Sequence, residues 1–118
     1  METMRERVVT KLTDVINSLT ALEGIHEGHD DIAVRDIRTV IGPITDLRDR
    51  YLAGVPQPLD PRSAHEIMKL SEDLEERGDK STSAIAKRDL NHEARNLSAF
   101  LTNVGLMVGS DGLRFTAT

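Results

Sequence analysis

The sequence predicts an all-α protein, a four-helix bundle-like domain formed by a single-domain chain of 118 residues. Three observations lead to this prediction. Apolar residues recur at alternating spacings of three and four in four separate segments, which is the period of one face of a helix. We find no segment that alternates apolar and polar residues as a half-buried strand would. The links between the segments are short and contain glycine or proline.

The first helix is expected over about residues 2–23, because its apolar side chains form one stripe and its charged side chains lie largely outside that stripe. Gly24 is expected to end this helix, since glycine readily adopts the conformation found just after a helix C-terminus. The stripe consists of Val8, Leu12, Val15, Leu19 and Leu22.

The second helix is expected over residues 31–53, with Asp30 or Asp31 as its N-terminal cap. Gly42 and Pro43 lie within this segment. Because proline removes a backbone donor and clashes with the preceding turn, the pair predicts either a kink in one helix or a division into two. The apolar stripe is unbroken across the pair, and this favours one kinked helix.

The third helix is expected over residues 61–77. Asp60 followed by Pro61 is typical of an N-terminal cap and a first helical position. Gly78 is expected to end the helix. The segment before Asp60 contains three of the four prolines and is therefore expected to be an extended connection.

The last long helix is expected over residues 81–108, starting at Asp79 or Ser81, and residues 109–118 are expected to form a frayed tail. The apolar spacing in the first and last helices is close to a heptad repeat, which permits coiled-coil packing. Their apolar faces exceed what one small bundle can cover, so we expect a homodimer.

Composition excludes several classes of protein. There are no cysteines, which excludes disulfides, zinc ribbons and thiolate catalysis. A net charge of −5 argues against a dedicated nucleic-acid binder. No apolar run approaches the ~18 residues of a membrane span. The N-terminus lacks the features of a secretory signal, so we expect a cytoplasmic protein without membrane contact.

The leading functional prediction is a small soluble regulatory module that binds a protein partner through a helix face. The sequence lacks a glycine-rich phosphate loop and a nucleophile elbow, so we expect no conventional catalytic activity and no cofactor. The expected partner-binding anchors are Phe100, Leu106 and Met107, apolar residues thought to remain after the bundle closes.

A local pattern within residues 88–104 carries a different prediction. His92 is followed by Glu93 at +1, Arg95 at +3 and Asn96 at +4. His92 lies off the apolar stripe, and Asn96 shares its helix face one turn later. This pattern resembles the phosphoacceptor box of two-component histidine kinases and related phosphotransferases.

The resemblance implies a histidine phosphotransfer module, or a mimic of one, as the alternative function. His92 would be the phosphoacceptor, Glu93 the base or orienting group, Arg95 a phosphate-facing cation and Asn96 a positioning amide. The partner would be a response-regulator receiver domain. The other interpretation is an exposed histidine among ordinary surface charges.

Two further patterns offer weaker chemistry. His26 and His29, with carboxylates beside them, are candidate metal ligands. Two ligands in one loop rarely form a site, so we expect no metal there and a polar turn instead. An acidic patch on the third helix either is a solvated surface or meets a basic partner. The acidic patch consists of Glu72, Asp73, Glu75, Glu76 and Asp79.

Overall fold

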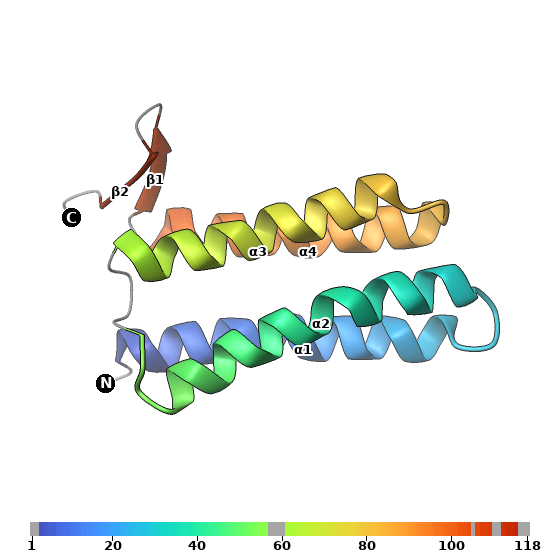
Figure 1. Cartoon of the computed structure of the whole chain (residues 1–118), viewed down its shortest axis with the longest axis horizontal. Helices are drawn as coiled ribbons and strands as arrows, with labels where there is room; N and C mark the ends of the chain where they lie inside the picture. Colours follow the sequence, from blue (N-terminus) through green and yellow to red (C-terminus); the bar gives the residue numbers. More distant parts are fainter. Residues whose placement is uncertain (1–2, 57–60, 105, 110–111, 116–118) are drawn as a thin grey trace.

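The computed structural model confirms the predicted helical bundle (Figure 1). It describes residues 3–56, 61–104, 106–109 and 112–115. The helices are α1 (Met4–His26), α2 (Asp31–Leu52), α3 (Pro61–Lys80) and α4 (Ala84–Asn103). Within the described residues, no helix has both the length and the apolar character needed to cross a membrane.

The bundle consists of two helical hairpins. α1 packs mainly against α2, and α3 packs mainly against α4. In Figure 1 the two pairs lie one above the other, with the α1–α2 and α3–α4 loops at the same end. The α2–α3 connection lies at the opposite end. Arg5 ties that connection to α1, because its guanidinium donates to the carbonyls of Tyr51 and Pro56 at 3.0 and 2.7 Å.

A single core cluster draws side chains from all four helices. Apolar burial of this kind contributes about 25 cal/mol per Å² removed from water. The largest apolar side chains with under 2% exposure are Leu12, Leu19, Ile37, Ile44, Leu47, Ile67, Leu74, Leu90, Leu97 and Leu101.

α1 begins at an N-terminal cap, Thr3, whose hydroxyl makes two contacts with Glu6. The Thr3 hydroxyl accepts from the Glu6 backbone N–H at 3.1 Å and donates to the Glu6 carboxylate. The helix continues past Gly24 to His26, so the predicted stop at Gly24 is wrong. No neighbouring atom lies within 4 Å of a Cβ built on Gly24. A glycine at such an open helix position costs only about 1 kcal/mol.

α2 is one helix that runs through Pro43, as the unbroken apolar stripe indicated. Asp30 caps its first turn by accepting from the Ala33 N–H at 3.0 Å. Because Pro43 has no N–H, the Thr39 carbonyl lacks its usual donor four residues later. Pro43 is exposed, so this cost falls on the surface of the bundle.

Small residues allow α3 and α4 to approach closely. Ala64, Ser71 and Gly78 are buried and lie seven residues apart on α3. The Ser71 hydroxyl donates to the Ala94 carbonyl of α4 at 2.8 Å. A side chain reaches the backbone of the neighbouring helix only where the two helices lie near each other, so this bond marks the line of contact.

Gly78 does not end α3, which continues to Lys80, so the predicted stop at residue 77 is wrong. A Cβ at Gly78 would lie 3.2 Å from both the Leu90 Cβ and the Lys87 carbonyl oxygen. This glycine therefore serves helix packing, which the sequence pattern could not distinguish from a C-terminal cap.

The C-terminal predictions require correction. α4 begins after its cap, Ser83, and ends at Asn103 instead of residue 108. An antiparallel hairpin follows, formed by β1 (Leu106–Gly109) and β2 (Gly112–Phe115). The predicted frayed tail is therefore wrong for residues 112–115. The physical reason is the glycines at positions 105, 109 and 112, because glycine is unfavourable in a helix interior.

Candidate functional site

The phosphoacceptor-like residues lie on α4, but they do not form one surface. His92 is exposed, as expected, and no hydrogen bond or ion pair joins it to another described residue. Glu93 is only 3% exposed. The Asn96 amide donates to the Glu93 carboxylate at 3.2 Å. The structure therefore brings Glu93 and Asn96 together and leaves His92 and Arg95 exposed without them.

The two candidate metal ligands of the α1–α2 loop are separated by their surroundings. His26 is 8% exposed, and its Nε2 lies 3.1 Å from an oxygen of Asp89. His29 is exposed. Among the described residues, no three histidine, aspartate or glutamate side chains gather where they could hold a metal ion. His26 instead connects α1 to α4 across the two hairpins.

The expected apolar anchors also lie elsewhere than predicted. Phe100 is 8% exposed and belongs to the core cluster, because the bundle itself uses its ring. It is therefore not a surface anchor. Leu106 and Met107 lie on β1 and not on the last turn of a helix. Their side chains lie outside the described part of the structure.

The helix caps at the loop end connect the two hairpins. Asp30 caps α2, and Ser83 caps α4 by accepting from the Ala86 N–H. The Ser83 hydroxyl also donates to the second carboxylate oxygen of Asp30 at 2.6 Å. This bond, helped by the Ala33 N–H, lowers the pKa of Asp30 from its ordinary value, because both donors stabilise the ionised carboxylate.

A buried carboxylate on α2 affects the surface nearby. Asp36 is 2% exposed. The Ser81 hydroxyl donates to it at 2.6 Å, and Arg77 of α3 approaches it at 3.8 Å. A buried anion without a countercharge is costly. Asp36 therefore has two cations near it, Arg77 of α3 and Arg35 of its own helix, whose Nε lies 3.7 Å from the carboxylate.

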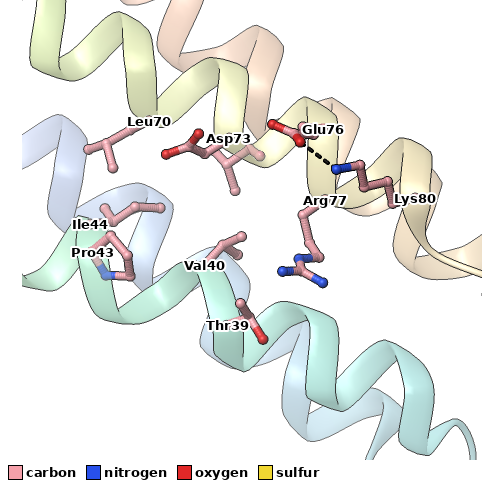
Figure 2. Close-up of a pocket in the computed structure, with 10 residues that line it drawn as sticks. Thr39, Val40, Pro43, Ile44, Leu70, Asp73, Glu76, Arg77 and Lys80 are labelled. Atoms are coloured by element: carbon pink, nitrogen blue, oxygen red, sulfur yellow. Dashed lines mark hydrogen bonds and ion pairs between the residues drawn. The ribbon is translucent and has the colours of Figure 1, made fainter.

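A concave surface lies between α2 and α3. Two adjoining hollows of about 260 and 220 Å³ share Pro43, Leu70 and Asp73 along their common boundary. We call this surface the α2–α3 groove. Figure 2 shows the hollow of about 260 Å³, which side chains of both α2 and α3 line. Its apolar lining consists of Pro43, which is exposed, and of core side chains that are each 9% exposed or less, namely Val40, Ile44, Leu47, Leu70 and Leu74.

Ion pairs line both sides of the groove. Lys80 donates to Glu76 at 2.6 Å, as Figure 2 shows, and this contact lowers the pKa of Glu76. Arg50 lies 3.7 Å from Asp46 on its own helix and 3.3 Å from Glu66 across the groove. These exposed pairs contribute little to stability, because water and salt screen them, so they leave the rims polar and rearrangeable.

Asp73 differs from the other rim acids. It is exposed, lines both hollows, and makes no hydrogen bond or ion pair with another described residue. Arg77, one turn later, reaches toward Asp36 instead. In Figure 2 the Asp73 carboxylate lies beside Leu70 between the two helices. Asp73 therefore places an uncompensated negative charge midway along an apolar groove.

Sequence reasoning found the parts of this groove without joining them. The sequence places Pro43 at a kink within one helix or at a division into two, with one kinked helix favoured, and it places Asp73 in an acidic patch. A proline that leaves the apolar stripe intact signals an exposed position on that helix, and this could have located one wall. Tertiary packing decides which sides of α2 and α3 face each other, and the apolar spacing along one helix does not specify this.

Comparison of the chain with protein-family models, curated proteins and solved structures gave no match.

Proposed function

We propose that this chain is a small protein–protein interaction module that binds its partner in the α2–α3 groove. The observation that carries the proposal is the combination of apolar lining and polar rims on one concave surface. Protein-binding grooves commonly bury an apolar centre and keep a polar edge. A regulatory role would follow from binding itself, because a partner that occupies the groove keeps other proteins from binding there.

The length of the groove supports a helical occupant. On α3 its lining extends from Glu66 to Lys80. At 1.5 Å per residue this stretch is about 21 Å long, which equals about four turns of a partner helix. A helix of this length presents apolar residues at i, i+3, i+4 and i+7. The groove therefore fits one amphipathic helix better than a small ligand.

A pair of neighbouring substitutions tests the proposal. Pro43→Gln places a long polar side chain in the middle of the groove and restores a helix-compatible backbone. Gly42→Gln is the matched control, because Gly42 is exposed on α2, lines neither hollow and has open space around its Cβ. Tagged wild-type protein and both variants are incubated with lysate of the source cell, and retained proteins are identified by mass spectrometry.

The proposal expects at least one protein that wild type and Gly42→Gln retain and that Pro43→Gln loses. Circular dichroism of each variant checks that the helices are intact. If every retained protein is equally retained by the Pro43→Gln variant, the groove is not the binding surface and the proposal fails.

A second candidate function is histidine phosphotransfer, and the exposure of His92 on a regular helix favours it. Glu93 is buried and its carboxylate accepts a hydrogen bond from Asn96. The role of Glu93 in phosphotransfer would therefore be limited to orienting neighbouring groups on the helix. His29 and His65 are also exposed and serve as internal comparisons. Phosphoramidate, a small phosphoryl donor, should label His92 several-fold faster than the other two, as followed by ³¹P NMR. Equal labelling would make His92 an ordinary surface histidine.

A further inference from the structure

We infer that the occupant of the α2–α3 groove is an amphipathic helix with one central basic residue, arginine or lysine, that pairs with Asp73. This inference rests on the proposed function and names the chemistry of the partner. Three features of the groove lead to it: the unpaired charge of Asp73, its central position, and the acceptors that surround it.

The negative charge of Asp73 is available because its nearest cations are engaged or poorly placed. Arg77, one turn later, lies 3.8 Å from the buried Asp36, which Arg35 also approaches at 3.7 Å, and Arg77 makes no ion pair with Asp73 within 4.0 Å. Lys69 lies one turn earlier and makes no ion pair with Asp73 within 4.0 Å. A lysine placed N-terminal to an acid is also the weaker orientation of an i, i+4 pair.

The position of Asp73 makes a charge pair there effective. Asp73 lies midway between Glu66 and Lys80, the two ends of the groove on α3. A partner helix that covers the apolar lining would exclude water from the middle of the groove first. Charge-assisted hydrogen bonds strengthen when water is excluded, and arginine is enriched at the centres of protein interfaces.

A second acceptor favours a donor-rich side chain. The Thr39 carbonyl lacks its helical donor because Pro43 has no N–H, and both residues line the same hollow as Asp73. A guanidinium carries five N–H donors in a fixed fork, so it can serve a carboxylate and a carbonyl together. Arginine is therefore the preferred basic residue, with lysine second.

The experiment uses a displayed library of 15-residue helical peptides, with positions i, i+3, i+4, i+7 and i+11 randomised to all residue types. The full chain is immobilised as wild type, Pro43→Gln and Gly42→Gln. The inference expects enriched peptides that combine apolar residues at the outer positions with arginine or lysine at a central one. These peptides should bind wild type and Gly42→Gln alike and should lose binding to Pro43→Gln.

Charge substitutions then test the contact itself. Asp73→Asn should weaken the binding affinity of the enriched peptides by about tenfold, which is the effect of losing one charge-assisted hydrogen bond. Glu72→Gln is the matched control, because it removes the same charge from the neighbouring exposed position outside the groove. Its effect should stay below about twofold. Selection of the same library for binding to immobilised Asp73→Lys protein should enrich acidic residues at the central position instead.

The outcomes separate this inference from the proposed function. The basic-helix inference would be overturned if groove-dependent peptides lack a central basic residue. It would also be overturned if they bind Asp73→Asn and wild type with equal affinity. In both cases the groove would remain a binding site. Failure to enrich any groove-dependent peptide would overturn both. Self-association of the chain that Pro43→Gln abolishes would assign the groove to a second copy and would also overturn the inference.

Discussion

Asp30 and Ser83 cap two different helices and are also hydrogen-bonded to each other at 2.6 Å. Asp30 begins α2 in the first hairpin, and Ser83 begins α4 in the second. One short contact therefore completes two helix termini and joins the two halves of the bundle. Both residues lie 53 positions apart in the sequence, so neither cap on its own indicates the link.

Replacing Ser83 by alanine should destabilise the protein more than loss of a simple cap. The variant loses the α4 cap and leaves Asp30 without its hydroxyl donor, which together cost about 2 kcal/mol. Ser18→Ala is the control, because Ser18 is exposed in the middle of α1. That control should change stability by less than about 0.5 kcal/mol. Urea unfolding followed by circular dichroism measures both, and equal effects would contradict the double role of Ser83.

The Asp30 contact should make stability depend on pH in the acid range. Its pKa in the folded protein lies below the ordinary value of 3.8, so the folded state favours the ionised form. The contribution is therefore complete above the unfolded pKa and is lost as pH falls through the lower folded pKa. Asp30→Asn keeps an N-terminal cap but carries no charge. The difference in urea midpoint between wild type and this variant should be constant at neutral pH and should narrow as the pH falls below 3.8, the ordinary pKa of an aspartate.

The Ser83→Ala variant provides an independent readout of the same contact. Without the hydroxyl donor, the pKa of Asp30 should rise toward its ordinary value, because the hydrogen bond is the largest influence on it. Carboxyl ¹³C NMR titration of the two proteins measures this directly. An Asp30 pKa that is identical in both would show that the Ala33 N–H alone sets it.

His26 and Asp89 should be strongly coupled in a double-mutant cycle. Each is 8% exposed, and the contact joins α1 to α4. Asp89→Ala leaves the buried His26 ring without this partner, and His26→Ala leaves the buried Asp89 with the exposed Arg88 guanidinium at 3.3 Å, so each should cost about 2–4 kcal/mol. The double variant should cost less than the sum by at least about 1 kcal/mol. Additive single effects would mean that the two side chains do not support each other.

Two glycines inside helices, Gly24 of α1 and Gly78 of α3, should respond oppositely to alanine. Gly24→Ala should stabilise by about 0.5–1 kcal/mol, because alanine is the better helix former and no neighbouring side chain lies within 4 Å of the added methyl group. Gly78→Ala should destabilise by about 1–3 kcal/mol, since its methyl would press on the backbone of Lys87 and the Cβ of Leu90. Thermal unfolding of both variants gives the comparison. Stabilisation by both would mean that α3 and α4 can separate at no cost.

Local patterns predicted the helical architecture, because burial on one helix face leaves a period that the chain itself records. The unbroken stripe around Pro43 correctly indicated a single helix. Sequence patterns failed where two different structural requirements favour the same residue type. A glycine near a helix end indicates a stop or a close contact, and only the position of Leu90 decides the meaning of Gly78.

The candidate site was less predictable for a related reason. Apolar spacing places Phe100 on a helix face but does not say whether the bundle already covers that face, and the structure shows that it does. The free charge of Asp73 depends on Asp36, 37 positions earlier, which engages Arg77 through the fold. Such competition for a countercharge exists only after the helices have packed.

The placement of the covalent connection has a consequence for how the chain can be divided. The α2–α3 connection lies at one end of the bundle, while Asp30 and Ser83 meet at the other. A polypeptide cut after Pro56 would keep each hairpin whole, and the contacts of Arg5 with the Tyr51 and Pro56 carbonyls would remain within the first fragment. Complementation of the two fragments would then report, as a bimolecular association constant, how much the hairpins attract each other without the effective concentration that the intact chain supplies.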